Sequence, residues 1–190
     1  MTRYAVYGGS FDPIHTGHLS VVERAVAQGY EVLVVPAYRH AFGKQSAPFE
    51  HRVQMCTLAL AASPFQMQAR VCTIERTLAQ ETDAPIYTYD VLCALRMRLH
   101  MAPCLLTGPD IAAEWTRWYQ HEAIDREFGR ISFAMTRRVR SSMIRQQLRT
   151  GAALADLHAE LPEAVRMYIK AEALYRDNPP VSETRCSVHP

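Results

Sequence analysis

The chain has 190 residues, 48% of them hydrophobic, and a formal net charge of +2 at pH 7. This small charge argues against nucleic acid or an acidic membrane as a partner, and no apolar stretch approaches transmembrane length. The N-terminus lacks the pattern of a secretory signal, so we expect a cytoplasmic protein with a single domain over residues 1–176.

Cysteine usage agrees with that compartment. The five cysteines are odd in number and scattered, without a C-x-x-C pair, which favours free thiols in a reducing environment. Residues 177–190 read DNPPVSETRCSVHP and contain three prolines with little apolar content. We expect this last segment to be a mobile tail.

The first half of the chain alternates apolar runs with helical periodicity. YAVY at 4–7 and EVLVVP at 31–36 have the composition of buried strands. Between them, apolar residues recur at helical spacing, and Gly29 marks the place where this helix stops. Pro48 is expected to begin a second helix, and ARVCTI at 69–74 is the third predicted strand.

The same alternation continues through the middle of the chain. Thr88 is expected to cap a helix, and PCLLTG at 103–108 is the fourth predicted strand. A helix that carries Trp115 and Trp118 follows, and RISFAM at 130–135 is the fifth strand.

Two more helices are predicted toward the end, one capped by Ser141 and one opened by Pro162. Strands that alternate with helices imply right-handed crossovers, so we predict an α/β fold with a doubly wound parallel sheet and a C-terminal helical segment. Ligands of such sheets bind beyond the carboxyl ends of the strands.

The segment GGSFDPIHTGHL follows the first predicted strand and has the features of a phosphate site. Gly8 and Gly9 carry no side chain, so a phosphate can approach the backbone closely. His15 and His18 lie on one face if a helix begins near them, and they then project where free N–H groups favour anions. Two imidazoles there can donate hydrogen bonds to phosphate oxygens and stabilise charge that develops during phosphoryl transfer.

Other interpretations of this segment remain open. Two glycines after a strand are also compatible with an ordinary turn, and a histidine near a helix start with a capping or solvated side chain. No third metal ligand is suitably spaced near the two histidines, so we predict no protein metal site. The chain contains neither G-x-x-x-x-G-K-[ST] nor G-x-G-x-x-G.

RSSMIR forms a second candidate anion site. Ser141 and Ser142 stand at a predicted helix start, and Arg145 follows about one turn later. Hydroxyls and free N–H groups can hold phosphate oxygens there, and a guanidinium can bind two of them at once. Taken alone, the motif is also compatible with a capped helix and a solvated arginine.

The opening segment resembles the signature of the H-x-G-H nucleotidyltransferase superfamily, and within it the nicotinate/nicotinamide mononucleotide adenylyltransferases. The similarity extends to about Arg176 and includes four further segments: YTYDVL (87–92), TGPD (107–110), RSSMIR (140–145) and LPEAVRMYIKAEALY (161–175). The resemblance implies a Rossmann-like fold. It also implies a reaction in which the mononucleotide phosphate attacks the α-phosphorus of ATP, and pyrophosphate leaves with Mg²⁺.

The resemblance also assigns site residues. It implies that three residues are catalytic: His15, His18 and Arg145. ATP would be bound by these three and by nine more: Gly8, Gly9, Ser10, Phe11, Lys44, Gly108, Asp110, Ser141 and Ser142. The mononucleotide would contact Tyr87, Thr88 and Trp118. The partners are therefore ATP and a pyridine mononucleotide, while the sequence leaves the oligomeric state open.

Some features depart from the family pattern. The loop HAFGK, with His40 and Lys44, resembles that of eukaryotic nicotinamide members, whereas an aromatic ring at Trp118 favours the nicotinate form. We expect nicotinate mononucleotide to be the preferred substrate. FAMTRRVRSS joins the fifth strand almost directly to the second signature, so a loop near the substrate is expected to be missing or rebuilt. Arg52 reads as an ordinary residue on a helix surface.

Four alternatives remain. The substrate could be nicotinamide mononucleotide or, in another transferase of the superfamily, phosphopantetheine. YTYDVL and Trp118 argue against phosphopantetheine. A fragment of a class I aminoacyl-tRNA synthetase lacks support because the chain is short and has no basic stripe. A non-catalytic nucleotide sensor would not need to keep both His18 and Arg145.

Overall fold

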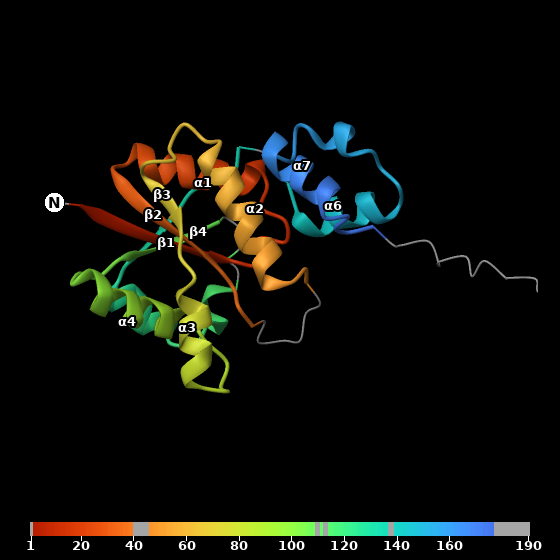
Figure 1. Ribbon diagram of the computed structural model, residues 1–190. Helices are drawn as coiled ribbons and strands as arrows, with labels where there is room; N and C mark the ends of the chain where they lie inside the picture. The colour runs from red at the N-terminus through yellow and green to blue at the C-terminus, as the bar shows by residue number, and fades with distance from the viewer. Residues whose placement is uncertain (1, 40–45, 109–110, 112–113, 137–138, 177–190) are drawn as a thin grey trace, which may run out of the picture.

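The computed structural model describes residues 2–39, 46–108, 111, 114–136 and 139–176 (Figure 1). The predicted roles of His40, Lys44 and Asp110 therefore fall outside the described residues, and so does the expected tail over 177–190.

A five-stranded sheet forms the centre of the protein, with the order β3-β2-β1-β4-β5 and parallel pairing throughout. Its strands are β1 (Arg3–Gly9), β2 (Tyr30–Pro36), β3 (Ala69–Val71), β4 (Cys104–Thr107) and β5 (Arg130–Ser132). The chain adds strands outward from β1 on one side and then returns to β4 on the other. This is the doubly wound α/β topology predicted from the sequence.

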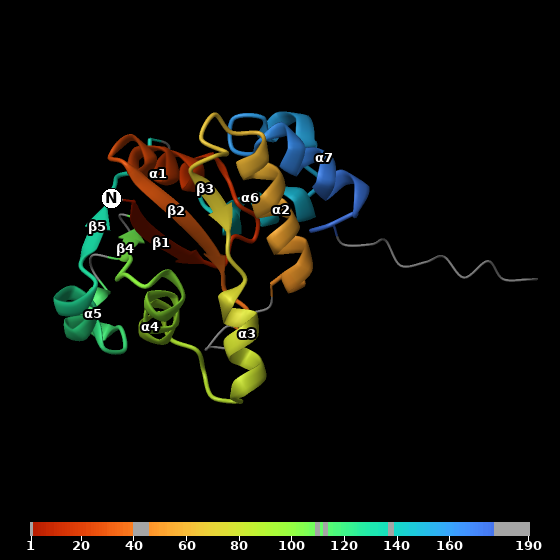
Figure 2. The same cartoon turned by 60° about the vertical axis from the view of Figure 1, so that its left-hand side comes forward.

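Helices cover both faces of the sheet (Figures 1 and 2). One face carries α1 (Thr16–Ala27), α2 (Phe49–Ala61), α6 (Ser141–Arg149) and α7 (Glu163–Ala171). The other face carries α3 (Ile74–Glu81), α4 (Thr88–Leu99) and α5 (His121–Glu127). Short 3₁₀ helices are η2 (Trp115–Arg117) and η3 (Leu154–Leu157).

Alternation along β1 divides the core between these two layers. Ala5 and Tyr7 pack with the first group of helices, whereas Val6 between them packs with the second. Successive side chains of a strand point to opposite faces, so a strand covered on both faces reads as a continuous apolar run. That is the physical reason why YAVY and EVLVVP could be recognised.

Three element predictions were wrong at their ends. β3 stops at Val71, and the residues that follow form α3, a helix that was not predicted. Ile74 is buried at the start of this helix, on the face of the sheet that α4 and α5 cover. Its apolar side chain made the short run ARVCTI look like one continuous strand. β5 likewise stops at Ser132, well before the predicted end at 135. The predicted helix with two tryptophans is only a 3₁₀ turn, after which Trp118 is extended.

The predicted helix caps also shift. Tyr87, not Thr88, is the N-cap of α4, and Asp90 accepts a hydrogen bond from the Tyr87 N–H at 3.0 Å. Arg140, not Ser141, is the N-cap of α6. Thr88 and Ser141 are instead the first residues of their helices, so neither hydroxyl caps a helix N-terminus.

Two further findings bear on the chemical environment. Among the described residues, no helix combines the length and apolar character needed to span a bilayer. Four cysteines are free thiols: Cys56, Cys72, Cys93 and Cys104. Cys186 lies outside the described part of the chain.

Candidate functional site

A cavity of about 330 Å³ opens at the carboxyl ends of β1 and β4. These two strands are neighbours, and the strand order reverses between them, which is where open α/β sheets bind ligands. Its walls include residues from β1, β4, α3 and α4: Gly8, Gly9, Ser10, Glu75, Thr88 and Leu105–Thr107. The cavity therefore adjoins the opening signature on one side and the predicted mononucleotide segment on the other.

The two signature glycines do not form a turn. Gly8 and Gly9 continue β1 and pair with Val35 and Pro36. A Cβ atom at Gly9 would lie 3.0 Å from the ring of Phe11, whereas one at Gly8 would have no atom within 4 Å. The first glycine thus leaves open space at the cavity, and the second leaves space for a neighbouring ring.

The loop after β1 is held in a strained conformation. Phe11 is buried and has φ of 47°, the left-handed region that bulky residues rarely adopt. Arg52 donates to the Ser10 carbonyl at 2.8 Å, and Arg145 donates to the Asp12 carbonyl at 2.6 Å. Two guanidinium groups therefore fix the backbone on both sides of Phe11.

His15 and His18 form one unit at the start of α1. His15 is the N-cap, and its Nδ1 accepts the His18 N–H at 3.2 Å, while the His18 Nδ1 accepts the His15 N–H at 3.3 Å. Their rings stack with centroids 3.6 Å apart. Since each Nδ1 accepts, each neutral ring carries its proton on Nε2. Each ring therefore carries an Nε2–H donor at the helix N-terminus that the reciprocal cap does not use.

Burial keeps both rings neutral. Desolvation lowers the pKa of His15 to about 4, against a smaller opposing effect of its backbone hydrogen bond. Desolvation also lowers the pKa of His18 well below its ordinary value, and the nearby His15 lowers it further. The rings of Tyr7 and Phe11 lie edge-on to His18, with centroids 6.1 and 5.0 Å away. Without a bound anion, the two histidines are hydrogen-bond donors rather than cations.

The residues of the second signature approach the first. The Ser141 hydroxyl donates to the Pro13 carbonyl at 3.0 Å, and Arg145 lies against Asp12, with Nη1 3.5 Å from Oδ2. Ser142 is exposed at the same helix start. Gly108 follows β4, and a Cβ there would be 3.8 Å from the Tyr7 hydroxyl. The structure therefore brings the two predicted phosphate segments into contact.

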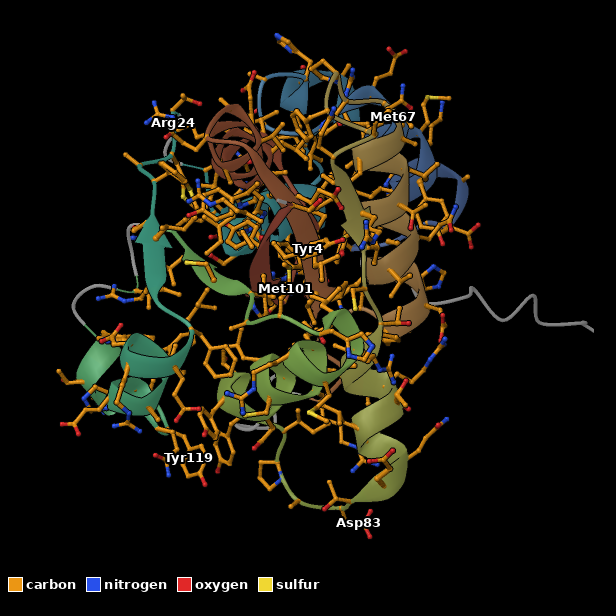
Figure 3. The ribbon with its side chains drawn as sticks, turned by 90° about the vertical axis from the view of Figure 1, so that its left-hand side faces the viewer. Tyr4, Arg24, Met67, Asp83, Met101 and Tyr119 are labelled. Atoms are coloured by element: carbon orange, nitrogen blue, oxygen red, sulfur yellow. The ribbon has the colours of Figure 1, made fainter. Side chains whose placement is uncertain are left out.

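Two of the three predicted mononucleotide residues line the cavity. Thr88 and Trp118 line it, and Trp118 packs on Trp115 with ring centroids 5.6 Å apart. Tyr87 does not line it; its exposed ring faces Tyr119 at 4.5 Å. Figure 3 shows Tyr119 at the end of the molecule formed by α4 and α5.

Sequence reasoning missed Arg52 and Glu75. The prediction of Arg52 as an ordinary surface residue was wrong: it is 2% exposed and donates to three backbone carbonyls. Glu75 lines the cavity, and its Oε2 accepts the Tyr38 N–H at 2.7 Å. A buried-face spacing with Met55 and Cys56 along α2 could have indicated Arg52. No local signal pointed to Glu75, because its helix was itself unexpected.

Within the described residues, no group of three or more His, Cys, Asp or Glu side chains is placed to hold a metal ion. Asp12, the buried carboxylate of the loop, already accepts from Ala47 and Tyr175. Mg²⁺ commonly binds through substrate phosphates with few protein ligands. A phosphate-bound magnesium ion fits this donor set better than a protein cage does.

These features define a nucleotide-binding α/β protein of the H-x-G-H nucleotidyltransferase class. The cytidylyltransferase-like family model matches residues 6–147. A protein of Anaeromyxobacter dehalogenans named nicotinate-nucleotide adenylyltransferase is 35% identical over 90% of this chain and 96% of its own. One of Tropheryma whipplei with that name is 33% identical over 89% of this chain and 97% of its own. The chain therefore belongs to the nicotinate-nucleotide adenylyltransferase family.

Solved structures agree on the fold. A Plasmodium falciparum nicotinic acid mononucleotide adenylyltransferase complexed with NaAD has a TM-score of 0.74 at 18% identity, covering 92% of this chain and 98% of its own. A Vibrio parahaemolyticus nicotinate-nucleotide adenylyltransferase has the same TM-score at 20% identity, covering 94% and 98%.

Proposed function

We propose that this protein joins the AMP part of ATP to nicotinate mononucleotide and releases pyrophosphate. The observation that carries the proposal is the stacked histidine pair, whose two remaining N–H donors lie at the start of α1. The His18 ring lies edge-on to Phe11, whose ring lies against Gly9, and Gly9 lines the cavity together with Thr88 and Trp118. This arrangement supports a site in which phosphate donors at α1 and the Trp118 ring act on one pyridine mononucleotide.

The reaction is a single in-line displacement. An oxygen of the mononucleotide phosphate forms a bond to the α-phosphorus of ATP. The bond from the α-phosphorus to the oxygen that bridges it to the β-phosphorus breaks, and the electron pair leaves with pyrophosphate. The attacking phosphate oxygen carries no proton, so no general base is required. Catalysis then depends on positioning and on stabilising charge on the phosphate oxygens.

Three residues would supply that stabilisation. His15 and His18 would donate from Nε2 to phosphate oxygens in the transition state, and Arg145 would act on the departing pyrophosphate. Mg²⁺ bound to the phosphates would neutralise part of their negative charge. Because the Ser141 hydroxyl is used on Pro13, Ser141 would contribute its backbone N–H, as would Ser142.

The remaining predicted contacts complete the proposal. ATP would also lie against Gly8, Gly9, Ser10, Phe11, Lys44, Gly108 and Asp110. The pyridine ring would stack on Trp118 and contact Thr88, whereas Tyr87 caps α4 beside the cavity rather than lining it. We also propose that residues 1–176 act as one domain.

The test is direct. The purified protein is incubated with ATP and Mg²⁺ plus nicotinate mononucleotide, nicotinamide mononucleotide or phosphopantetheine, and the adenylylated product and pyrophosphate are measured. We expect deamido-NAD to form with the highest kcat/KM. Equal or better use of the nicotinamide form would overturn the substrate assignment. ATP binding without mononucleotide-dependent pyrophosphate release would identify a sensor.

A further inference from the structure

Asp12 lies at the junction of the two phosphate segments. It has no exposed surface, and its Oδ1 accepts the Ala47 N–H at 3.2 Å and the Tyr175 hydroxyl at 2.7 Å. Its carbonyl oxygen accepts from Nη1 of Arg145, and its Oδ2 lies 3.5 Å from the same nitrogen. One buried carboxylate therefore connects the C-terminal segment to the arginine of the second signature.

Tyr175 is held firmly at this point. It follows α7 and has φ of 64°, a conformation that a bulky residue keeps only where its surroundings impose it. Its ring packs on the core beside Leu174, and its hydroxyl lies 4.0 Å from Sδ of Met55. Burial and the neighbouring Asp12 raise the pKa of this phenol, so it remains a donor at neutral pH.

The contacts make Tyr175 and Arg145 compete for one negative charge. A hydrogen bond to a buried carboxylate stabilises that charge, and removing one donor leaves the charge to its other partners. Without the Tyr175 hydroxyl, Asp12 would hold Arg145 more tightly. Arg145 is still partly accessible, with 13% of its side chain exposed, so a phosphate can reach it.

We propose that Tyr175 is a positioning residue that acts through Asp12 to keep Arg145 available to the phosphates. The proposal rests on the proposed function, in which Arg145 acts on pyrophosphate. It gives the C-terminal segment a part in the reaction, although Tyr175 itself does not touch the reacting atoms. A merely structural role for Tyr175 would instead affect folding without passing through Arg145.

A double-mutant cycle tests this route. Y175F, R145Q and the double variant are compared for pyrophosphate binding by calorimetry, for turnover, and for thermal unfolding. We expect Y175F alone to weaken pyrophosphate binding and lower turnover about tenfold, the size of a lost hydrogen bond to a charged group. In the R145Q background the same change should have little effect, because the positive charge that Asp12 attracts is gone. Independent effects that multiply would overturn the proposal.

Tyr168 provides the matched control. Its hydroxyl lies 2.8 Å from Nδ1 of His51 where α7 packs against α2, so Y168F also removes one phenolic hydrogen bond. We expect Y168F to leave pyrophosphate binding unchanged. A loss equal to that of Y175F would mean that any tyrosine near α7 acts through stability alone.

A second variant covers the case in which Y175F folds poorly. D12N keeps the shape of the side chain but removes the charge that attracts Arg145. We expect it to bind pyrophosphate at least as tightly as the parent, and Y175F to add no loss in the D12N background. Because pyrophosphate binding needs no mononucleotide, the cycle gives its answer even if no dinucleotide is formed. If the parent protein binds pyrophosphate but makes no dinucleotide, only the proposed function is refuted. The role of Tyr175 is then still decided by the pyrophosphate-binding cycle.

Discussion

His15 and His18 each accept the other's backbone N–H on Nδ1, at 3.2 and 3.3 Å, and their rings lie 3.6 Å apart. The two side chains thus close the first turn of α1 as a reciprocal cap, the role usually taken by a hydroxyl and a carboxylate. Gly17 between them fits this arrangement, because a Cβ there would lie 3.1 Å from the His15 ring. The two hydrogen bonds and the ring stack therefore fix the orientation of both imidazole rings.

We predict different effects for two substitutions of His18. His18→Asn keeps an acceptor at the position of Nδ1 but removes the Nε2–H donor. Turnover should fall about a hundred- to thousandfold, as for loss of one oxyanion donor. His18→Ala should lose turnover similarly and also destabilise the fold by about 1 kcal/mol, because the cap is gone. Steady-state kinetics and urea unfolding measure the two effects.

The outcome separates capping from catalysis. If folded His18→Asn retains near-normal turnover, the imidazole serves only the helix. Equal stability of the Ala and Asn variants would instead show that the reciprocal cap contributes nothing.

The sequence predicted that the two histidines lie together, for a local reason. Two histidines three residues apart after a strand must share a face if a helix begins there, so their pairing follows from spacing alone. The reciprocal cap could not be predicted, because it depends on where α1 begins. Of the two anticipated alternatives, the cap is confirmed because the histidines cap α1, and the turn is wrong because the glycines belong to β1.

We predict opposite consequences for the two signature glycines. Gly9→Ala would place its Cβ 3.0 Å from the ring of buried Phe11, so we expect a loss of about 1–3 kcal/mol in stability. Gly8→Ala meets no atom within 4 Å, so its stability should be unchanged or slightly higher. If a phosphate of ATP approaches the backbone at Gly8 as proposed, the KM of the Gly8→Ala variant for ATP should rise about tenfold. Thermal unfolding and initial-rate kinetics on both variants decide this. An unchanged KM for ATP in Gly8→Ala would move the phosphate away from the end of β1.

We predict a large loss of stability for Arg52→Lys. The Arg52 guanidinium reaches the carbonyls of Ala47, Ser10 and Ala37 at 2.9, 2.8 and 2.7 Å. An ammonium group has no planar fork that meets three carbonyls at once. We expect a loss of about 3 kcal/mol, since each hydrogen bond to a charged group contributes about 1.5–3 kcal/mol. Denaturant unfolding at equilibrium measures the change.

Arg76→Lys is the control for this substitution. Arg76 has 43% of its side chain exposed and pairs with the more exposed Glu50 at 2.7 Å, so the change should be within about 0.5 kcal/mol. A loss for Arg52→Lys no larger than this would show that the three carbonyl contacts do not hold the signature loop.

Arg52 also shows what one sequence cannot reveal. Two of its partners, Ser10 and Ala37, follow separate strands and come near Arg52 only in the folded protein. The spacing of residues along the sequence predicts which face of its own helix a residue occupies. It does not predict which backbone carbonyls at the end of a distant strand need a hydrogen-bond donor. The same limit hid Glu75, whose position depends on where β3 gives way to α3. The outlines of the fold follow from local periodicity, whereas these long-range contacts of the site do not.

Glu75 leads to a prediction about pH. Its carboxyl lines the cavity beside Gly8 and Ser10, and burial raises its pKa to about 7, against the smaller opposing effects of the Tyr38 N–H and Arg52. As pH rises through 7, Glu75 gains a negative charge close to where an anionic mononucleotide would bind. We therefore expect mononucleotide affinity to fall about three- to tenfold between pH 6 and pH 8.

Glu75→Gln keeps the shape and the hydrogen-bond acceptor for Tyr38 but cannot ionise. We expect its mononucleotide affinity to lack this additional loss at high pH, so the ratio of the two proteins' dissociation constants should change with pH. Titration of the ligand's own phosphate occurs with both proteins and cancels in that ratio. Glu81→Gln, at the exposed end of the same helix, should behave like the parent protein.

Folding stability gives an independent readout of the same carboxyl group. Its ordinary pKa is 4.5 and its folded pKa is about 7, so the folded state binds more protons between these values. Its ionisation therefore weakens folding as pH rises through that range, and Glu75→Gln should remove this contribution. Calorimetric binding and denaturant unfolding at pH 5, 6, 7 and 8, at constant ionic strength, test both effects. Identical pH dependence of affinity in the parent and in Glu75→Gln would exclude Glu75 from the mononucleotide side of the cavity.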